Sequence, residues 1–169
     1  GTAIPCAGTG QDGDKLKGIT WPNPRFTNNG NGTVTDNLTG LIWMQNANCL
    51  GGKTWTDAMN VCGSMASGSC GLSDGSSAGD WRLPNIKELL SLIDYAYYEP
   101  TLSNDAGTGQ WTAATGSSFT GVLVYFFWSS TTYPQSITDA LWVDMSNGDV
   151  YGYDKTNNDC YVWPVRGGQ

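Results

Sequence analysis

The chain has 169 residues, which suits one domain with a buried core. Its net charge is −7, it contains no histidine, and charged residues make up only 14% of it. This acidic balance argues against nucleic acid and anionic membranes as partners, because both require basic patches. No stretch of the sequence is long and apolar enough to insert into a membrane.

Residues 1–20 are rich in Gly, Thr and Asp and show no hydrophobic period, which predicts a flexible linker. The alternative is an extended arm that pairs with the sheet edge of a neighbouring copy. The folded domain is expected over residues 21–169. Its many Gly, Asn and Asp residues predict short strands joined by loops.

Three short antiparallel strands are expected first, at residues 25–27, 33–36 and 41–44. The turn at 28–32 reads Asn-Asn-Gly-Asn-Gly, and these residues tolerate a positive φ. This turn lacks the spaced carboxylates and the closing Glu of a calcium loop. No metal site is therefore expected.

The first helix is expected over residues 54–67, capped by Thr54 with Asp57 three residues later. Apolar residues recur on one face of this helix. They are Trp55, Ala58, Met59, Cys62 and Met65.

The second helix is expected over residues 85–95. Asn85 is a natural N-cap, and Glu88 three residues later completes a capping box. The inward face of this helix holds Ile86, Leu89, Leu90 and Ile93.

The rest of the chain has a β pattern. Residues 122–128 form a continuous apolar run, which predicts a central strand. Residues 140–145 alternate, with Trp142 and Asp144 on the face opposite Leu141 and Val143. An Asn-Gly turn then predicts a hairpin whose returning strand covers 150–153, and a final strand is expected over 161–166.

The five cysteines are scattered and form no C-x-x-C pair, and no histidine is present to complete a zinc site. This arrangement is typical of disulfides formed in an oxidising compartment, so we expect a secreted or cell-surface protein. The sequence leaves the connectivity open. The pairs we expect are Cys49–Cys70 and Cys62–Cys160, and the partner of Cys6 would then lie beyond this chain.

Five segments, taken in order, resemble the Lcl C-terminal domain family of bacterial proteins. These segments are Arg25–Asp36, Leu38–Trp43, Asp80–Leu89, Phe127–Thr131 and Val162–Gly168. The resemblance implies an α+β, C-type-lectin-like fold in which two helices flank a twisted, mostly antiparallel sheet with long loops. It also implies secretion, surface display and adhesion.

Two ligands associated with similar proteins are not expected here. The collagen-like adhesin after which the family is named is associated with sulfated glycans, which require Lys and Arg. This chain has eight basic residues against fifteen acidic ones. The calcium-dependent sugar motifs of C-type lectins are also missing.

No catalytic motif is visible, so we expect that the chain is not an enzyme and carries no cofactor. The absence of histidine excludes Ser-His-Asp and Cys-His arrangements. Several aspartates recur about every five residues near the C-terminus, and we interpret them as turn and loop acids. They are Asp139, Asp144, Asp149, Asp154 and Asp159.

A binding face requires exposed aromatic rings and short polar groups, and residues 147–161 are richest in both. The competing interpretation is a hairpin whose tyrosines pack on neighbours and whose asparagines make turns. The candidate ligand-binding residues are Tyr133, Asp149, Tyr151, Tyr153, Asp154, Asn157, Asn158 and Asp159. Five tryptophans are assigned to packing: Trp43, Trp81, Trp128, Trp142 and Trp163.

Two functions remain open on this basis. The first is a recognition and adhesion module that binds a glycan or a protein receptor through its C-terminal loops. The alternative is a structural subunit of an extracellular fibre or stalk, in which residues 1–20 pair onto another copy.

Overall fold

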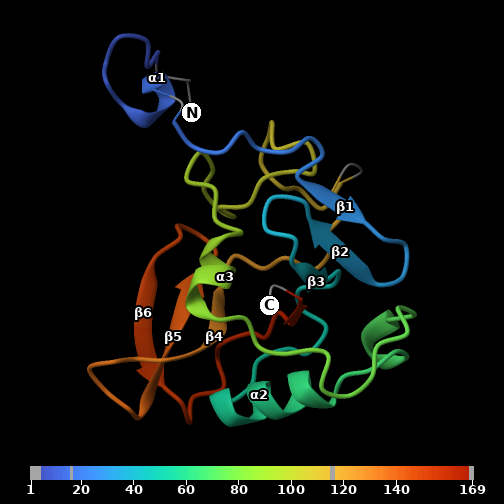
Figure 1. The fold of residues 1–169 in the computed structure, drawn as a ribbon. Coiled ribbons are helices and arrows are strands. Elements are labelled where there is room, and N and C mark those ends of the chain that lie inside the picture. The colour runs from blue at the N-terminus through green and yellow to red at the C-terminus, as the bar shows by residue number, and fades with distance from the viewer. Residues whose placement is uncertain (1–4, 16, 115–116, 168–169) are drawn as a thin grey trace.

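The computed structural model describes residues 5–15, 17–114 and 117–167, and Figure 1 shows the fold. The parts of the expected arm, domain and closing motif that fall on residues 1–4, 16, 115–116 and 168–169 lie outside the described residues. The elements are α1 Asp12–Lys15, β1 Phe26–Asn28, β2 Thr33–Asp36, β3 Ile42–Met44, α2 Trp55–Ser64, the 3-10 turn η1 Ser69–Gly71, α3 Ile86–Leu90, β4 Phe126–Thr132, β5 Asp139–Asp144, β6 Val150–Asp154 and β7 Val165–Arg166. The α+β class is confirmed.

The described strands form two antiparallel sheets where the sequence predicted one (Figure 1). The first has the order β1-β2-β3-β7, so the last strand pairs with β3. Gly32 ends the turn between β1 and β2 with φ +83°, and a Cβ there would lie 2.7 Å from the carbonyl oxygen of Gly71. The turn therefore requires glycine, since the chain of η1 passes directly against it.

The second sheet has the order β4-β5-β6. The predicted central strand over 122–128 is displaced, because ladder pairing starts only at Phe126 and continues to Thr132. Val122 is buried without belonging to a strand, while Val124 and Tyr125 are exposed. The first part of the apolar run 122–128 is a loop that enters the core, so the run alone did not predict where the strand begins.

Both predicted helices form, with different lengths. The hydroxyl of Thr54 accepts from the Asp57 backbone N–H, and α2 ends at Ser64. Its buried face is narrower than predicted, since Met59 is 39% exposed.

Helix α3 has the predicted capping box but ends at Leu90, five residues early. The Ser91 hydroxyl donates to the Glu88 carbonyl oxygen at 2.6 Å, and the chain then turns. The Asp94 N–H donates to the Thr101 carbonyl oxygen, a partner outside the helix. These bonds replace the helical ladder at its end.

A buried ion pair joins the start of the first sheet to its second strand. The Arg25 guanidinium donates to both carboxylate oxygens of Asp36 at 2.8 and 3.0 Å, and both side chains are 0% exposed. Arg25 also donates to the Ser91 carbonyl oxygen and lies over the rings of Trp21 and Phe26. The two hydrogen bonds to Asp36 and the third to Ser91 offset most of the desolvation cost of burying the guanidinium charge.

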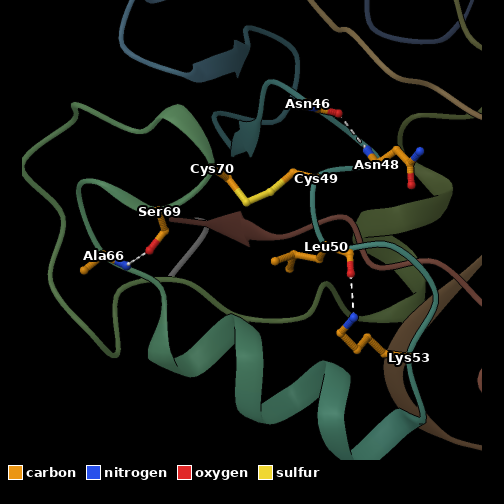
Figure 2. The surroundings of a disulfide bond; sticks show 8 residues. All are labelled: Asn46, Asn48, Cys49, Leu50, Lys53, Ala66, Ser69 and Cys70. Carbon is orange, nitrogen blue, oxygen red and sulfur yellow. Dashed lines mark hydrogen bonds between the residues drawn. A yellow bond between two sulfur atoms is a disulfide. The ribbon is translucent and has the colours of Figure 1, made fainter.

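The predicted disulfide between Cys49 and Cys70 is confirmed, with 6.0 Å between the two Cα atoms. Figure 2 shows that it joins the segment after β3 to η1. Beside it, the Leu50 carbonyl oxygen accepts from Lys53 Nζ. The cross-link closes a loop with a sequence separation of 21 and holds α2 between its ends.

The predicted Cys62–Cys160 disulfide is wrong in this structure, in which both residues are separate thiols. Each side chain is 0% exposed and lies in a cluster with Ala58 and Trp128. Buried free cysteines behave as small apolar side chains, so this packing needs no bond between them. Burial raises the pKa of each thiol to about 12, with the negative charge of Asp159 adding to the effect at Cys160.

Alkylation should separate the two classes of cysteine. In unfolded, unreduced protein, iodoacetamide should label Cys62 and Cys160 but not Cys49 and Cys70, as read by peptide mass mapping. In native protein near pH 8, Cys62 and Cys160 should react slowly, because a thiol with a raised pKa is rarely present as the reactive thiolate. Protection of Cys62 and Cys160 in the unfolded, unreduced chain would contradict the structure.

Candidate functional site

The predicted binding segment lies on β6, at the edge of the second sheet, and on the loop that follows it (Figure 1). Tyr151 pairs in register with Trp142, and Tyr153 pairs with Ala140. Side chains two residues apart on a strand share one face, so both tyrosines lie on the same face as Trp142. Their surroundings on that face differ.

Tyr153 is held inside the fold. Its ring packs on Trp128, with 6.2 Å between centroids, and its hydroxyl accepts from Asn157 Nδ2 at 2.8 Å. Asn157 Oδ1 in turn accepts from the Asp159 backbone N–H. These contacts fit the packing interpretation, in which the tyrosine and the asparagine stabilise the loop.

The remaining loop residues do not converge on one point. The Asp154 carboxylate accepts the hydroxyl and backbone N–H of Thr156, and these bonds lower its pKa. Asn158 and Asp159 are exposed. Tyr133 lies against Gly152, where a Cβ would approach its ring to 2.6 Å. Gly152 alternates with Tyr151 and Tyr153, so Tyr133 lies over the opposite face of the sheet.

Asp149 and Tyr151 belong to a different grouping, formed with residues that the sequence assigned to the core. Four rings contact one another in a row, which we name the aromatic strip. Its members are Tyr125, Phe126, Trp142 and Tyr151, with successive centroid distances of 4.7, 4.2 and 5.4 Å. Tyr125, which also packs edge-on against Tyr161, is 42% exposed and Tyr151 is 56% exposed, so the ring at each end of the strip reaches solvent.

The strip is exposed because only part of this sheet face is covered. Near Trp128 and Ala140 the face packs with Ala58 and Cys62 of α2. Trp142 is part of the same cluster and Phe126 packs against it, so only the outer rings of the strip, Tyr125 and Tyr151, reach solvent. Trp142 is 9% exposed, and its indole N–H has no hydrogen-bond partner among the described residues.

Two carboxylates flank the strip. Asp144 pairs in register with Phe126 and therefore shares its face. Asp149 accepts from Asn147 Nδ2 at 2.7 Å, and the Tyr151 hydroxyl lies 3.5 Å from the same oxygen. Hydrogen-bond acceptors thus stand beside exposed ring surface, an arrangement suited to binding a ligand that carries donors.

Sequence reasoning missed Tyr125 and Phe126 and assigned Trp142 to packing alone. A signal was available in the alternation of β5, which puts Trp142 and Asp144 on one face and Leu141 and Val143 on the other. A tryptophan that shares its face with an aspartate indicates a surface that solvent reaches.

A separate shallow hollow of about 280 Å³ lies between the β2–β3 turn and α3. The Thr39 hydroxyl there donates to Asp36, and the Ser91 hydroxyl donates to the Glu88 carbonyl oxygen. Because these hydroxyl groups already donate hydrogen bonds within the protein, the hollow offers few polar groups that could bind a ligand.

No described helix has the length and apolar character needed to cross a bilayer. Nor do three His, Cys, Asp or Glu side chains gather in the described residues as a metal ion would require.

The family model of the Lcl C-terminal domain matches residues 32–166, which include both sheets apart from β1. The chain belongs to this family. The match confirms the resemblance noted in the sequence. No curated protein and no solved structure matches the chain.

Tyrosine substitutions should separate packing from surface roles. Tyr153→Ala should lower the free energy of unfolding by about 2 kcal/mol, because it removes a ring packed on Trp128 and a hydrogen bond. Tyr151→Ala should cost less than about 1 kcal/mol, as expected of an exposed side chain. Urea unfolding measures both. Equal costs would contradict the different placement of the two rings.

Proposed function

We propose that this Lcl C-terminal domain is a non-catalytic, extracellular recognition module that binds a glycan or a protein receptor. The observation that carries the proposal is the aromatic strip, a row of four rings whose two end members, Tyr125 and Tyr151, are exposed to solvent. Large rigid rings contribute contact area at little entropic cost, which is why binding surfaces are rich in them. The disulfide supports a location outside the reducing cytosol.

The binding surface we propose is therefore shifted from the one expected in the sequence. Asp149 and Tyr151 remain in it, and Tyr125 and Phe126 join it. Tyr153 and Asn157 hold the adjoining loop in place.

Binding to target cells tests this proposal. Tyr151→Ala should reduce binding of the labelled protein by about tenfold, because a stacked ring contributes on the order of 1 kcal/mol. Tyr98→Ala is the matched control, since Tyr98 is 64% exposed but lies outside the strip. Equal binding by both variants and the parent chain would reject the strip as the site.

A fibre or stalk subunit remains the second candidate, and two observations favour it. Among the described strands of the second sheet, β6 lies at the open edge, whereas β4 is bonded on its outer side by Tyr161 and Pro84. Residues 5–15 and 17–20 extend away from the body of the molecule (Figure 1). Although this segment holds the short helix α1, its remaining residues could add a strand to the β6 edge of another copy.

Deleting residues 1–20 tests this second candidate. The deletion should abolish concentration-dependent assembly in analytical ultracentrifugation while leaving the unfolding midpoint unchanged. A parent chain that stays monomeric at high concentration would exclude the fibre role.

A further inference from the structure

We infer that the ligand of the aromatic strip is a neutral saccharide, held by stacking of sugar ring faces on Tyr125 and Tyr151. This inference rests on the proposed recognition function and specifies its ligand. Three properties of the strip favour such a ligand: the shape of its exposed surface, the polar groups beside it and the charge around it.

The shape suits a flat ligand. Phe126, Trp142 and Tyr151 share one face of the sheet, Tyr125 continues the row from the residue before β4, and successive planes are tilted by 41–48°. The negative face of an aromatic ring attracts the C–H groups that line one side of a pyranose. Because the rings at both ends of the row are exposed, the row can accept a sugar unit from within a longer chain.

The neighbouring groups suit hydroxyl donors. Asp144 and Asp149 lie beside the rings; one oxygen of each already accepts a hydrogen bond, Asp144 Oδ1 from the Ser146 N–H and Asp149 Oδ2 from Asn147 Nδ2, and the second oxygen of each is the acceptor we assign to the ligand. Sugar hydroxyls donate well to carboxylates, and such charge-assisted bonds are stronger than neutral ones. The hot spots of protein partners, in contrast, usually fill desolvated pockets, which an exposed row of rings does not provide.

The negative charge around the strip excludes an anionic sugar as its ligand. Both groups beside the strip are acidic, and the net charge of the chain is −7. Five of the eight basic residues serve the fold. Arg25, Arg82 and Arg166 form ion pairs, while Lys53 and Lys155 donate to backbone oxygens. Sulfate or carboxylate groups on a ligand would therefore meet repulsion at the strip.

Affinity electrophoresis in gels containing soluble polysaccharide tests the inference on the full chain. The probes are mannan, laminarin and dextran, with dextran sulfate as the anionic counterpart of dextran. We expect retardation by at least one neutral polymer and none by dextran sulfate. The retardation should be similar at about 0.1 M and about 1 M NaCl, although the Debye length falls from about 10 to about 3 Å.

Variants then locate the binding. Tyr125→Ala and Tyr151→Ala should each weaken retardation about tenfold, whereas Tyr151→Phe, which keeps the ring, and the Tyr98→Ala control should match the parent. Unchanged melting temperatures would show that the alanine variants fold. Equal weakening by Tyr151→Phe and Tyr151→Ala would overturn stacking as the basis.

Two further outcomes separate this inference from the proposed function. If no neutral polymer retards the chain, while cell binding still requires Tyr151 and is abolished by protease treatment of the cells, the saccharide inference is wrong and the recognition proposal stands. If dextran sulfate binds and salt displaces it, the charge argument is wrong.

Discussion

The incomplete cover of one sheet face is the constraint from which the rest of this account follows. Helix α2 packs on the β4-β5-β6 sheet near Trp128 and Ala140, where Cys62 fills the interface. Trp142 belongs to the same cluster and Phe126 packs against it, whereas Tyr125 and Tyr151 at the two ends of the strip stay exposed. Burial of Trp142 by the rings on either side of it lowers the cost of exposed apolar surface, but it leaves the outer rings in contact with solvent.

The scaffold keeps this surface in one place. The Arg25–Asp36 pair ties the first strand to the second and reaches the chain after α3 through Ser91. The disulfide fixes the segment before α2 to the turn after it, which limits how far the helix can shift on the sheet. Four tryptophans are the largest fully buried side chains and fill the space between the sheets and helices. A rigid support of this kind lowers the entropy lost when a ligand is bound.

Much of the local structure could be predicted because it depends on neighbours in sequence. Thr54 and Asn85 cap their helices through bonds to residues three positions away, and the Asn-Gly turns close their hairpins through glycines with a positive φ. The Cys49–Cys70 pairing was also within reach, since Cys70 follows the helix that the cross-link encloses.

The remaining features depend on contacts between distant segments, which a local pattern does not contain. The division into two sheets depends on the pairing of β7 with β3. The same two segments are joined by the hydrogen bond from the Trp163 indole to the Met44 carbonyl oxygen, and these residues are 119 positions apart in the sequence. Helix α3 ends early because the Leu92 and Ile93 N–H groups bond to carbonyls three residues back and the Asp94 N–H then bonds to Thr101. Tyr151 and Tyr153 look equivalent in sequence, yet contacts with Trp128 and Asn157 leave Tyr153 only half-exposed, while Tyr151 is open to solvent.

Chemical-shift mapping of the isotope-labelled chain, titrated with a saccharide fragment from a polymer that retards it, would locate the ligand on the molecule. If the ligand binds at the aromatic strip, the largest changes should fall on Tyr125, Phe126, the Trp142 indole N–H and residues 149–151, with small changes at residues 154–159. The largest changes at residues 154–159, with none at Trp142, would contradict binding at the strip and return the site to the loop after β6.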